Sequence, residues 1–289
     1  MFKYYQKTLK IVENLLNCII VILLLPRNLI FRNVFKKNKR SDRIFVLGNG
    51  PSLKDDYNKI VTMKSESDSV MVVNSFSCAK EYEEIKPNYY VMADSAFFIN
   101  DPEPHIKKVQ EDAFGNMISK TNWDMTVIVP SYARFGEAFN RIKENPKIKV
   151  QLFKSTPIVG GSDAINNIFF KFGIANPLFQ NVLTACLFYS IKMKFSNIIL
   201  WGGDHSWHEG YIMQKDNVLY TKDKHFYDNK EKLIPHINAD GTSVKVHEEF
   251  ASLSRAFNSY HIIRSFAAVE GVSIKNFSDT SWIDAFDRQ

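Results

Sequence analysis

An apolar run that stops at a glycine-rich turn is the most informative stretch of this chain. Residues 43 to 47 read Arg-Ile-Phe-Val-Leu, and the turn Gly48-Asn49-Gly50-Pro51-Ser52 follows without a spacer. The run is typical of a buried parallel strand, and Pro51 fits the first turn of a helix. Glycine allows positive φ and close approach of a ligand to the backbone, and Ser52 adds a hydroxyl beside free amide N–H groups. We therefore expect this turn to contact a phosphate or a nucleotide, although an ordinary strand-to-turn connection uses the same residues.

Apolar runs rich in Val and Ile recur from residue 43 onward and alternate with longer amphipathic stretches. This alternation predicts an α/β fold, a Rossmann-like and mostly parallel sheet with helices on both faces. The expected strands are Ile44–Leu47, Val70–Val73, Tyr89–Ala93, Thr126–Val129, Lys149–Phe153, Ile198–Trp201 and Ser273–Phe277. The carboxyl ends of parallel strands face one crevice, so we expect Gly48, Asn74, Asp94 and Gly202 to surround a single site.

The N-terminal segment differs from the rest of the chain. Residues 9 to 31 are dominated by Leu, Ile, Val and Phe, and a basic cluster follows at Lys36, Lys37, Lys39, Arg40 and Arg43. The apolar stretch is interrupted by Asn14, Asn17 and Pro26 and is shorter than the roughly 20 residues that span a bilayer. We predict a membrane-associated helix and basic linker over residues 1–42. A packing helix of a soluble oligomer and a single spanning helix are the alternatives, and the absence of a small-residue cleavage site argues against a signal peptide.

Length and composition favour one catalytic domain for the remaining residues 43–289, with two domains as the alternative. The net charge of +6 would permit nucleic acid, anionic lipid or an anionic metabolite as a partner. No nucleic-acid module is recognisable, so nucleic acid is not an expected partner. The three cysteines lack Cys-x-x-Cys spacing and fit neither a disulfide framework nor a thiolate zinc site, which favours a reducing, cytoplasmic setting.

A second group of polar residues begins at Asn181 and ends at Asp204 and His205, beyond the strand expected over 198–201. Asp204 could hold a sugar hydroxyl, orient a histidine or bind a metal, and a capping aspartate is equally consistent. His205, His208 and Glu209 make only a weak metal-ligand pattern. The chain also contains no Asp-x-Asp pair, so we expect neither a metal nor a cofactor.

Four segments of the chain follow the order seen in bacterial sialyltransferases of glycosyltransferase family 42: Leu47–Leu53, Val73–Phe76, Asp94–Phe98 and Asn181–Asp204. The chain also resembles the wider group of "domain of unknown function 115" proteins, which includes motility accessory factors and an archaeal pterin pyrophosphokinase. The resemblance covers roughly residues 43 to 280, and its specific part is the Gly-Asn-Gly-Pro-Ser-Leu motif. It implies a CMP-activated sugar donor, metal-independent inverting transfer and a histidine general base.

The same resemblance implies roles for individual residues. The nucleotide would contact Gly48, Asn49, Gly50, Pro51 and Ser52, with Asn74 close to it. Asp94 stands where the family has an asparagine, and Asn181 stands near the position of a Thr-Ser pair. These two departures leave the sugar undetermined.

Residues 204 to 247 lack clear periodicity and hold many aromatic, charged and histidine residues, which predicts a long functional loop or lid. A neutral histidine with a pKa near the working pH can take a proton from an acceptor hydroxyl. His247 follows this stretch roughly where the family's base occurs, and His205 and His225 are further candidates. Each histidine alone is more often structural than catalytic.

The leading hypothesis is a membrane-associated, sialyltransferase-like glycosyltransferase of cell-surface polysaccharide or lipooligosaccharide assembly. Its partners would be a CMP-sugar donor, a glycan or lipid-linked acceptor and the cytoplasmic face of the inner membrane, with a homo-oligomer left open. One alternative is a pyrophosphokinase-like enzyme that binds magnesium through Asp94 and Asp204. Another is a nucleotide-binding accessory protein without turnover.

Overall fold

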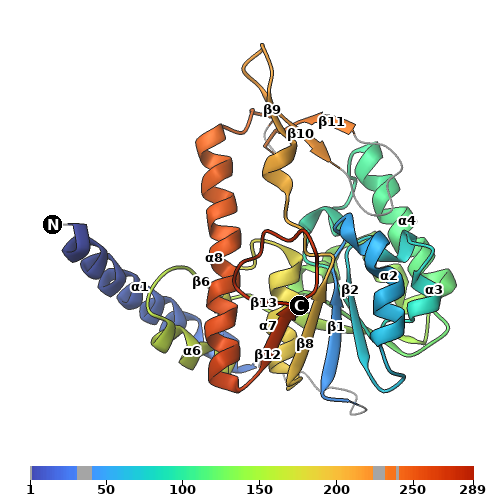
Figure 1. Ribbon diagram of the computed structural model, residues 1–289, viewed down its shortest axis with the longest axis horizontal. Coiled ribbons are helices and arrows are strands. Elements are labelled where there is room, and N and C mark those ends of the chain that lie inside the picture. Colours follow the sequence, from blue (N-terminus) through green and yellow to red (C-terminus); the bar gives the residue numbers. More distant parts are fainter. Residues whose placement is uncertain (1, 31–40, 224–231, 239–240) are drawn as a thin grey trace.

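An eight-stranded sheet forms the centre of the computed structural model, which describes residues 2–30, 41–223, 232–238 and 241–289 (Figure 1). The strand order is β13-β12-β8-β1-β2-β3-β4-β5, and all neighbouring pairs are parallel. The strands are β1 (Arg43–Leu47), β2 (Ser69–Val73), β3 (Tyr89–Val91), β4 (Met125–Pro130), β5 (Ile148–Phe153), β8 (Asn197–Trp201), β12 (Ser273–Asn276) and β13 (Asp287–Arg288). This sheet confirms the predicted α/β class and every expected strand, with small differences at strand ends. The two-residue edge strand β13 was not predicted, because so short a strand has no detectable pattern.

Helices cover both faces of the sheet, as predicted (Figure 1). Side chains of Ile44 and Val46 point into one core, whereas those of Phe45 and Leu47 point into the other, because successive residues of a strand face opposite sides. The helices are α1 (Phe2–Ile30), α2 (Ser52–Met63), α3 (Tyr82–Ile85), α4 (Pro104–Lys120), α5 (Glu137–Asn140), α6 (Asp163–Phe172), α7 (Val182–Lys192) and α8 (Val246–Glu270). Helices α6, α7 and α8 supply side chains to the first core, and α2, α3, α4 and α5 supply side chains to the second.

Short 3₁₀ helices connect several elements: η1 (Phe76–Cys78), η2 (Ser95–Phe97), η3 (Ser131–Phe135), η4 (Arg141–Glu144) and η5 (Trp207–Gly210). The strands β6 (Pro157–Ile158) and β7 (Asn176–Pro177) form a separate two-stranded pair. These connections complete the layers around the main sheet.

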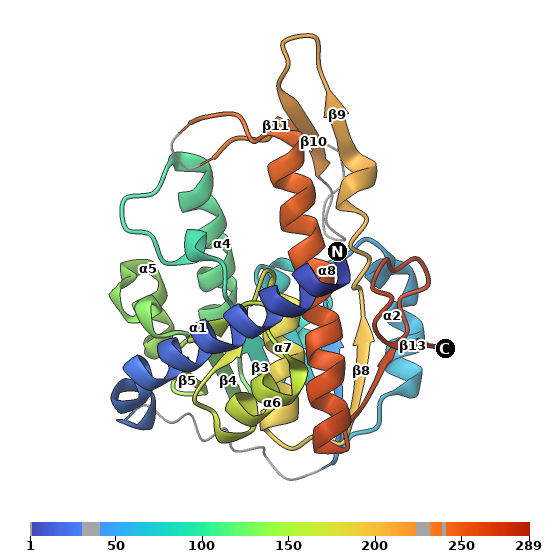
Figure 2. The same cartoon turned by 90° about the vertical axis from the view of Figure 1, so that its left-hand side faces the viewer.

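The stretch predicted as a loop or lid contains a second sheet. Strands β9 (Tyr211–Met213), β10 (Leu219–Asp223) and β11 (Lys232–Pro235) pair antiparallel and stand beyond the N-terminal end of α8 (Figure 2). Glu249 of α8 holds this sheet, since it accepts hydrogen bonds from the Tyr211 hydroxyl and from His236 Nε2, the latter at 3.0 Å. The prediction of an irregular loop is therefore wrong for these strands, because their alternation is too short to detect in the sequence.

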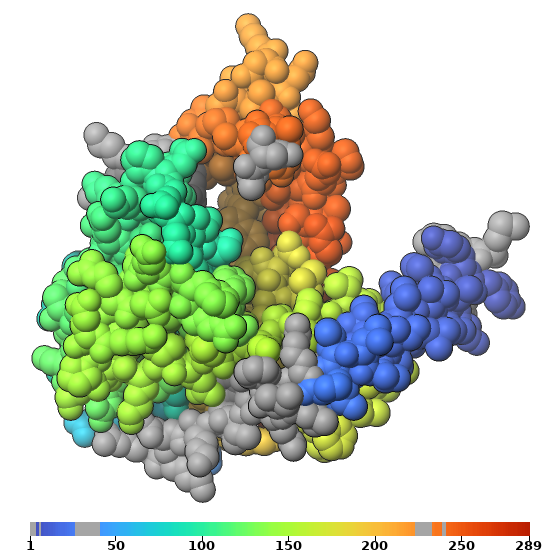
Figure 3. Space-filling view, turned by 180° about the vertical axis from the view of Figure 1, so that it is seen from behind, coloured from blue at the N-terminus to red at the C-terminus, as the bar shows by residue number. Residues whose placement is uncertain are grey.

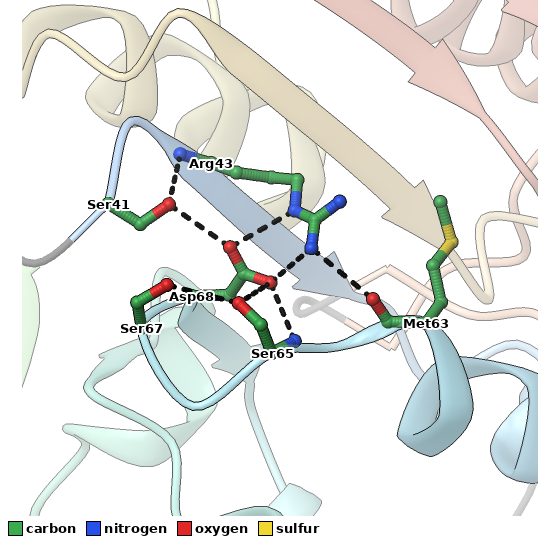
Figure 4. A network of polar contacts seen from close by, with 6 residues as sticks. All are labelled: Ser41, Arg43, Met63, Ser65, Ser67 and Asp68. Carbon is green, nitrogen blue, oxygen red and sulfur yellow. Dashed lines mark hydrogen bonds and ion pairs between the residues drawn. The ribbon is translucent and has the colours of Figure 1, made fainter.

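An ion pair joins β1 to the loop before β2 at the end of the sheet where these strands begin (Figure 4). Arg43 Nε donates to Asp68 Oδ1 at 3.0 Å, and Asp68 also accepts from the amide and hydroxyl of Ser65 and from the hydroxyl of Ser41. Burial alone would raise the pKa of Asp68, but these hydrogen bonds lower it to about 2. The network fixes the strand starts and lies away from the carboxyl edge.

Helix α1 continues through Pro26, and its segment Lys7–Pro26 has 20 residues with a mean hydropathy of 2.0. By length and composition this segment could cross a membrane. The spanning helix that the sequence left as an alternative is therefore permitted by length, because Asn14, Asn17 and Pro26 interrupt the apolar stretch without ending the helix. Whether the helix spans depends on what its polar residues contact.

Candidate functional site

A cavity of about 900 Å³ lies beyond the carboxyl ends of the central strands. In Figure 3 the surface is hollowed between the region of α4 and the start of α8. The lining comes from the segments after β1, β2, β3 and β8, from the start of α7 and from the edge of the β9–β10 hairpin: residues 49–51, 73–74, 93–95, 179–183, 202, 204–207, 209–210 and 222. Of the four residues predicted to surround one site, Asn74, Asp94 and Gly202 line this cavity and Gly48 does not. The cavity lies at the place where open parallel sheets bind ligands.

The turn after β1 is bonded to the loop after β8. The amide of Gly48 donates to the carbonyl of Trp201 at 2.8 Å, and the amide of Gly50 donates to the carbonyl of Gly202 at 2.9 Å. The amide of Ser52 donates to Asp204 Oδ2 at 3.0 Å. The expectation of free amides in this turn is therefore wrong for these three groups, since the neighbouring loop already satisfies them.

Asp204 takes the place at the start of α2 that an anion would occupy. Its carboxylate is buried, with Oδ2 accepting from the Ser52 amide and Oδ1 accepting from the Thr280 hydroxyl at 3.2 Å. A carboxylate at a helix N-terminus is favourable because the unpaired amides carry partial positive charge. The structure thus supports the capping interpretation of Asp204 that the sequence left open.

The glycines of the turn are required by this close packing. A Cβ on Gly48 would lie 2.4 Å from the carbonyl oxygen of Gly202. A Cβ on Gly50 would lie 2.0 Å from Asp204 Oδ2 and 2.6 Å from the same carbonyl oxygen. The neighbouring loop, rather than a ligand, therefore explains why both positions hold glycine.

Buried polar atoms without a hydrogen-bond partner gather around the cavity. Among the described residues they include Asn49 Oδ1, Asn74 Oδ1 and Asn181 Nδ2, all on residues that line the cavity, and Ser52 Oγ at the adjoining helix start. Asn74 also has a φ of 46°, a left-handed conformation that asparagine adopts more readily than most residues. Because an unsatisfied buried polar atom costs about 1–3 kcal/mol, such a set indicates a site built for a polar ligand.

A chain of three side chains fixes the orientation of His205. Asn181 Oδ1 accepts from the Thr184 amide at 3.2 Å, which identifies this atom as the oxygen and leaves Nδ2 directed elsewhere. The Tyr260 hydroxyl donates its proton to the same Oδ1 at 2.9 Å. The hydroxyl oxygen must then accept from His205 Nε2, with which it is in contact. His205 consequently carries its proton on Nε2 and a lone pair on Nδ1.

His205 lies in an apolar environment at the edge of the cavity. Its ring stacks on Trp207 with 4.1 Å between centroids, and its backbone has a φ of 55°. Burial lowers the pKa of His205 to about 3, so the imidazole is neutral at physiological pH. A buried neutral histidine with a fixed tautomer offers a proton acceptor whose position is defined by the fold.

Of the other two candidate histidines, the structure describes only His247. His247 is exposed in the first turn of α8 and does not belong to the lining of the cavity. His225 lies outside the described residues. Asp94 does line the cavity, where it is exposed and accepts from the Ala96 amide at 2.9 Å. Of the two candidate histidines that the structure describes, His205 lines the cavity together with predicted nucleotide residues and His247 does not.

The charge of the cavity is acidic. Among the described residues, its lining contains the carboxylates of Asp94, Asp204 and Glu209 and one cationic side chain, that of Lys222. Within the part of the chain that the structure describes, no group of three or more His, Cys, Asp or Glu residues is placed to hold a metal ion. The buried polar atoms of the lining that lack a hydrogen-bond partner belong to the neutral side-chain amides of Asn49, Asn74 and Asn181.

Sequence reasoning missed Tyr260, and it singled out Lys222 only as one of several lysines that could offset phosphate charge or form a solvated basic face. Tyr260 lies in the middle of α8, where a tyrosine is typical of a packed core. Lys222 lies in β10, a strand that the sequence did not predict. Neither residue carries a local signal, because the relation of each to the cavity is set by packing between distant segments.

Comparison with known proteins identifies the family. A family described as "6-hydroxymethylpterin diphosphokinase MptE-like" matches residues 23–210, which is more than half of the chain. The chain belongs to the MptE-like family. This membership agrees with the pterin pyrophosphokinase part of the resemblance seen in the sequence, and the resemblance to sialyltransferases stays a prediction.

Among solved structures, the MAf glycosyltransferase from Magnetospirillum magneticum AMB-1 is similar to this MptE-like chain at 14% identity with a TM-score of 0.49. The alignment covers 89% of this chain and 35% of that one, so this chain spans about a third of the length of that protein. No curated protein matches the chain.

Proposed function

We propose that this protein transfers a glycosyl group from a CMP-activated sugar to a hydroxyl of a glycan or lipid-linked acceptor during cell-surface polysaccharide or lipooligosaccharide assembly. The observation that supports the proposal best is the pairing of a neutral, oriented His205 with unsatisfied amide groups on one cavity. The histidine provides a base, and the amides provide contacts for the polar groups of a nucleotide.

The proposed step uses the lone pair on His205 Nδ1. As the acceptor oxygen forms its bond to the anomeric carbon, its proton passes to Nδ1, and the bond from that carbon to the phosphate oxygen breaks. CMP leaves with the electron pair of the broken bond. Proton removal by a positioned base contributes about 10²- to 10⁴-fold to rate.

The low pKa of His205 fits this role only when a donor is present. An imidazole with a pKa of about 3 is a weak base, because burial disfavours imidazolium. A phosphate bound in the cavity brings negative charge close to the ring and raises its pKa toward neutrality. Donor binding would thus make the base effective at the moment it is needed.

The charge of the lining supports a donor with one phosphate. A nucleoside triphosphate carries about four negative charges, and a site for it ordinarily supplies several cations or a metal ion. Here the described lining offers Lys222 against three carboxylates. A single phosphodiester contacted by neutral amides suits this environment better.

The family supports a second candidate, a diphosphokinase that transfers a diphosphate group to a hydroxymethyl group, as the family description states for its pterin substrate. That reaction also removes a proton from an acceptor hydroxyl, so it could use the same histidine. Magnesium would then be needed, and Asp94 and Asp204, which both line the cavity, are the carboxylates that we propose to hold it. Both oxygens of Asp204 already accept hydrogen bonds from the protein, which leaves Asp94 as the more available ligand.

The expected setting is the cytoplasmic face of the inner membrane, reached through the apolar helix α1 and the basic residues that follow it. This location would give the cavity access to lipid-linked acceptors. A homo-oligomer stays a possibility that size measurements can test.

A thermal-shift experiment on the purified protein separates the candidates. CMP should raise the melting temperature without added metal, since a ligand that binds the native state stabilises it by mass action. CDP, UDP and ATP are compared with and without magnesium. A thermal shift with ATP and magnesium, and none with CMP, would contradict the glycosyltransferase proposal and favour the diphosphokinase.

A second experiment tests the base. In His205→Asn the new side chain tolerates the left-handed backbone, and we expect glycosyl transfer to fall by about 10²- to 10⁴-fold while the CMP thermal shift persists. His247→Asn is the matched control and should keep near-normal transfer. If the His247 variant loses transfer and the His205 variant does not, the base is His247.

A further inference from the structure

Three polar residues in the middle of the apolar helix α1 contact the rest of the protein. The amide of Gly161 donates to Glu13 Oε2 at 2.8 Å, and the amide of Ser162 donates to Asn14 Oδ1 at 2.8 Å. Asn17 Nδ2 donates more weakly to the carbonyl of Val159 at 3.4 Å. Residues 13, 14 and 17 share one face of a helix, so the contacts define a docking face.

The partner of this face is the N-terminus of α6. The amides of Gly161 and Ser162 immediately precede that helix and belong to its unpaired, partly positive end, which a carboxylate and an amide oxygen satisfy. A Cβ on Gly160 would lie 2.4 Å from the carboxyl carbon of Glu13, and both glycines have positive φ. Glycines at these positions allow α1 to approach, which indicates a built contact.

The position of these contacts along α1 decides how the helix can meet a membrane. They lie near the centre of the segment Lys7–Pro26, so a spanning α1 would carry the loop over residues 159–162 into the hydrocarbon core. Irregular backbone exposed to lipid is not tolerated there, because its polar groups have no partner. The docked helix is thus incompatible with a transmembrane position.

The opposite face of α1 is apolar and exposed. By helical periodicity it lies about half a turn from the docking face, and its exposed residues are Ile11, Val12, Leu15, Ile19, Ile22 and Leu23. Leu9, Leu16 and Ile20 are also exposed and lie between the two faces, on the side of Glu13. Figure 3 shows the N-terminal part of α1 projecting beside the body of the protein. An exposed apolar stripe on a helix whose polar face is already occupied is the arrangement of an interfacial helix.

We propose that α1 is a monotopic anchor that lies in the plane of an anionic lipid surface, with Glu13, Asn14 and Asn17 docked on α6 and the apolar face in the acyl layer. The inference rests on the membrane association proposed above and specifies its geometry. The basic residues Lys36, Lys37, Lys39 and Arg40 follow α1 in the sequence and complement anionic headgroups. One apolar face and one basic cluster supply the two signals that stable surface binding needs.

The first experiment tests whether both ends of α1 lie on the same side of the bilayer. The full chain is added to phosphatidylcholine–phosphatidylglycerol vesicles, so that the catalytic domain stays outside them. An added protease should remove an N-terminal tag, since an in-plane helix keeps both of its ends on the same side. A tag that is protected until detergent is added would overturn the in-plane geometry while leaving membrane association intact. Failure of the wild-type protein to sediment with vesicles would instead remove the membrane association itself.

Two sets of variants test the faces. The triple variant Leu15→Gln, Ile19→Gln, Leu23→Gln should lose vesicle binding by at least tenfold and keep the CMP thermal shift. Glu13→Ala with Asn14→Ala should lower the melting temperature, because it leaves the amides of Gly161 and Ser162, just before α6, without their partners. An unchanged melting temperature would overturn the docking. If the triple variant instead converts a dimer to a monomer and leaves vesicle binding unchanged, the apolar face binds a second copy of this chain.

Discussion

At the scale of single residues, Gly50 sets the distance between two loops of the site. A Cβ there would meet Asp204 Oδ2 at 2.0 Å, so Gly50→Ala must displace the carboxylate that caps α2. We expect the free energy of unfolding to fall by about 1–3 kcal/mol, as measured by urea denaturation, and the CMP thermal shift to weaken.

The matched control is Gly115→Ala in α4, where a Cβ would meet no atom within 4 Å. That change should stabilise the protein by about 0.5–1 kcal/mol, because glycine inside a helix has high conformational entropy when unfolded. Equal stabilities of the Gly50 variant and the wild type would contradict the packing described for the turn.

Tyr260 acts on His205 from within the protein, as a positioning residue. In Tyr260→Phe the hydroxyl that accepts from His205 Nε2 and donates to Asn181 Oδ1 is lost. Both tautomers of His205 then become available, and we expect kcat to fall about tenfold or more with little change in CMP binding.

Nitrogen-15 NMR of the imidazole measures this effect directly. The wild-type spectrum should show a proton on Nε2, and the Tyr260→Phe spectrum should show a mixture of tautomers. A variant that loses kcat while its tautomer is unchanged would assign Tyr260 a different role.

At the scale of elements, the Arg43–Asp68 pair connects β1 to the loop before β2 (Figure 4). Hydrogen bonds depress the pKa of the Asp68 carboxyl to about 2 in the folded protein, below its value in the unfolded chain. The pair therefore contributes stability that is complete above about pH 4 and is lost as the pH falls toward 2. Asp68→Asn should lower the free energy of unfolding by about 2 kcal/mol at pH 7.

In the same variant, the free energy of unfolding should fall less than in the wild type between about pH 4 and 2, as measured by urea denaturation across that range. The CMP thermal shift at pH 7 is the control, because the pair lies at the opposite end of the strands from the cavity. If the free energy of unfolding falls with pH to the same extent in the variant and the wild type, other carboxylates govern acid unfolding.

At the scale of the whole molecule, α1 is separable from the α/β domain. Of the residues of α1 whose burial is described, Asn17 and Val21 are buried, whereas both cores of the main sheet come almost entirely from the rest of the chain. We expect deletion of residues 1–34 to leave a folded, soluble domain that responds to CMP and no longer binds anionic vesicles.

Sedimentation with vesicles and thermal shift measure the two properties separately. Neutralising Lys36, Lys37, Lys39 and Arg40 in the full chain should weaken vesicle binding in a salt-dependent way, since exposed charges are screened. Vesicle binding that survives the deletion would place the membrane-binding surface on the domain.

The strands of the main sheet and its layered class follow from the sequence because their signals are local. A buried parallel strand is a short apolar run, and each expected run from Ile44–Leu47 to Ser273–Phe277 became a strand of the sheet. The cavity position also follows, since strand ends of a parallel sheet share one edge. The sheet β9–β11 escaped prediction because its strands are short and only partly buried.

The chemistry within the cavity was decided by tertiary structure. The Ser52 amide bonds Asp204 across 152 positions, Tyr260 meets His205 across 55 and Asn181 across 79, and Gly161 meets Glu13 across 148. No local pattern encodes these contacts, because each depends on how separate elements pack. The sequence therefore determined which strand ends border the site. Packing decided which backbone amides are already hydrogen-bonded within the protein, how His205 is oriented and where α1 docks.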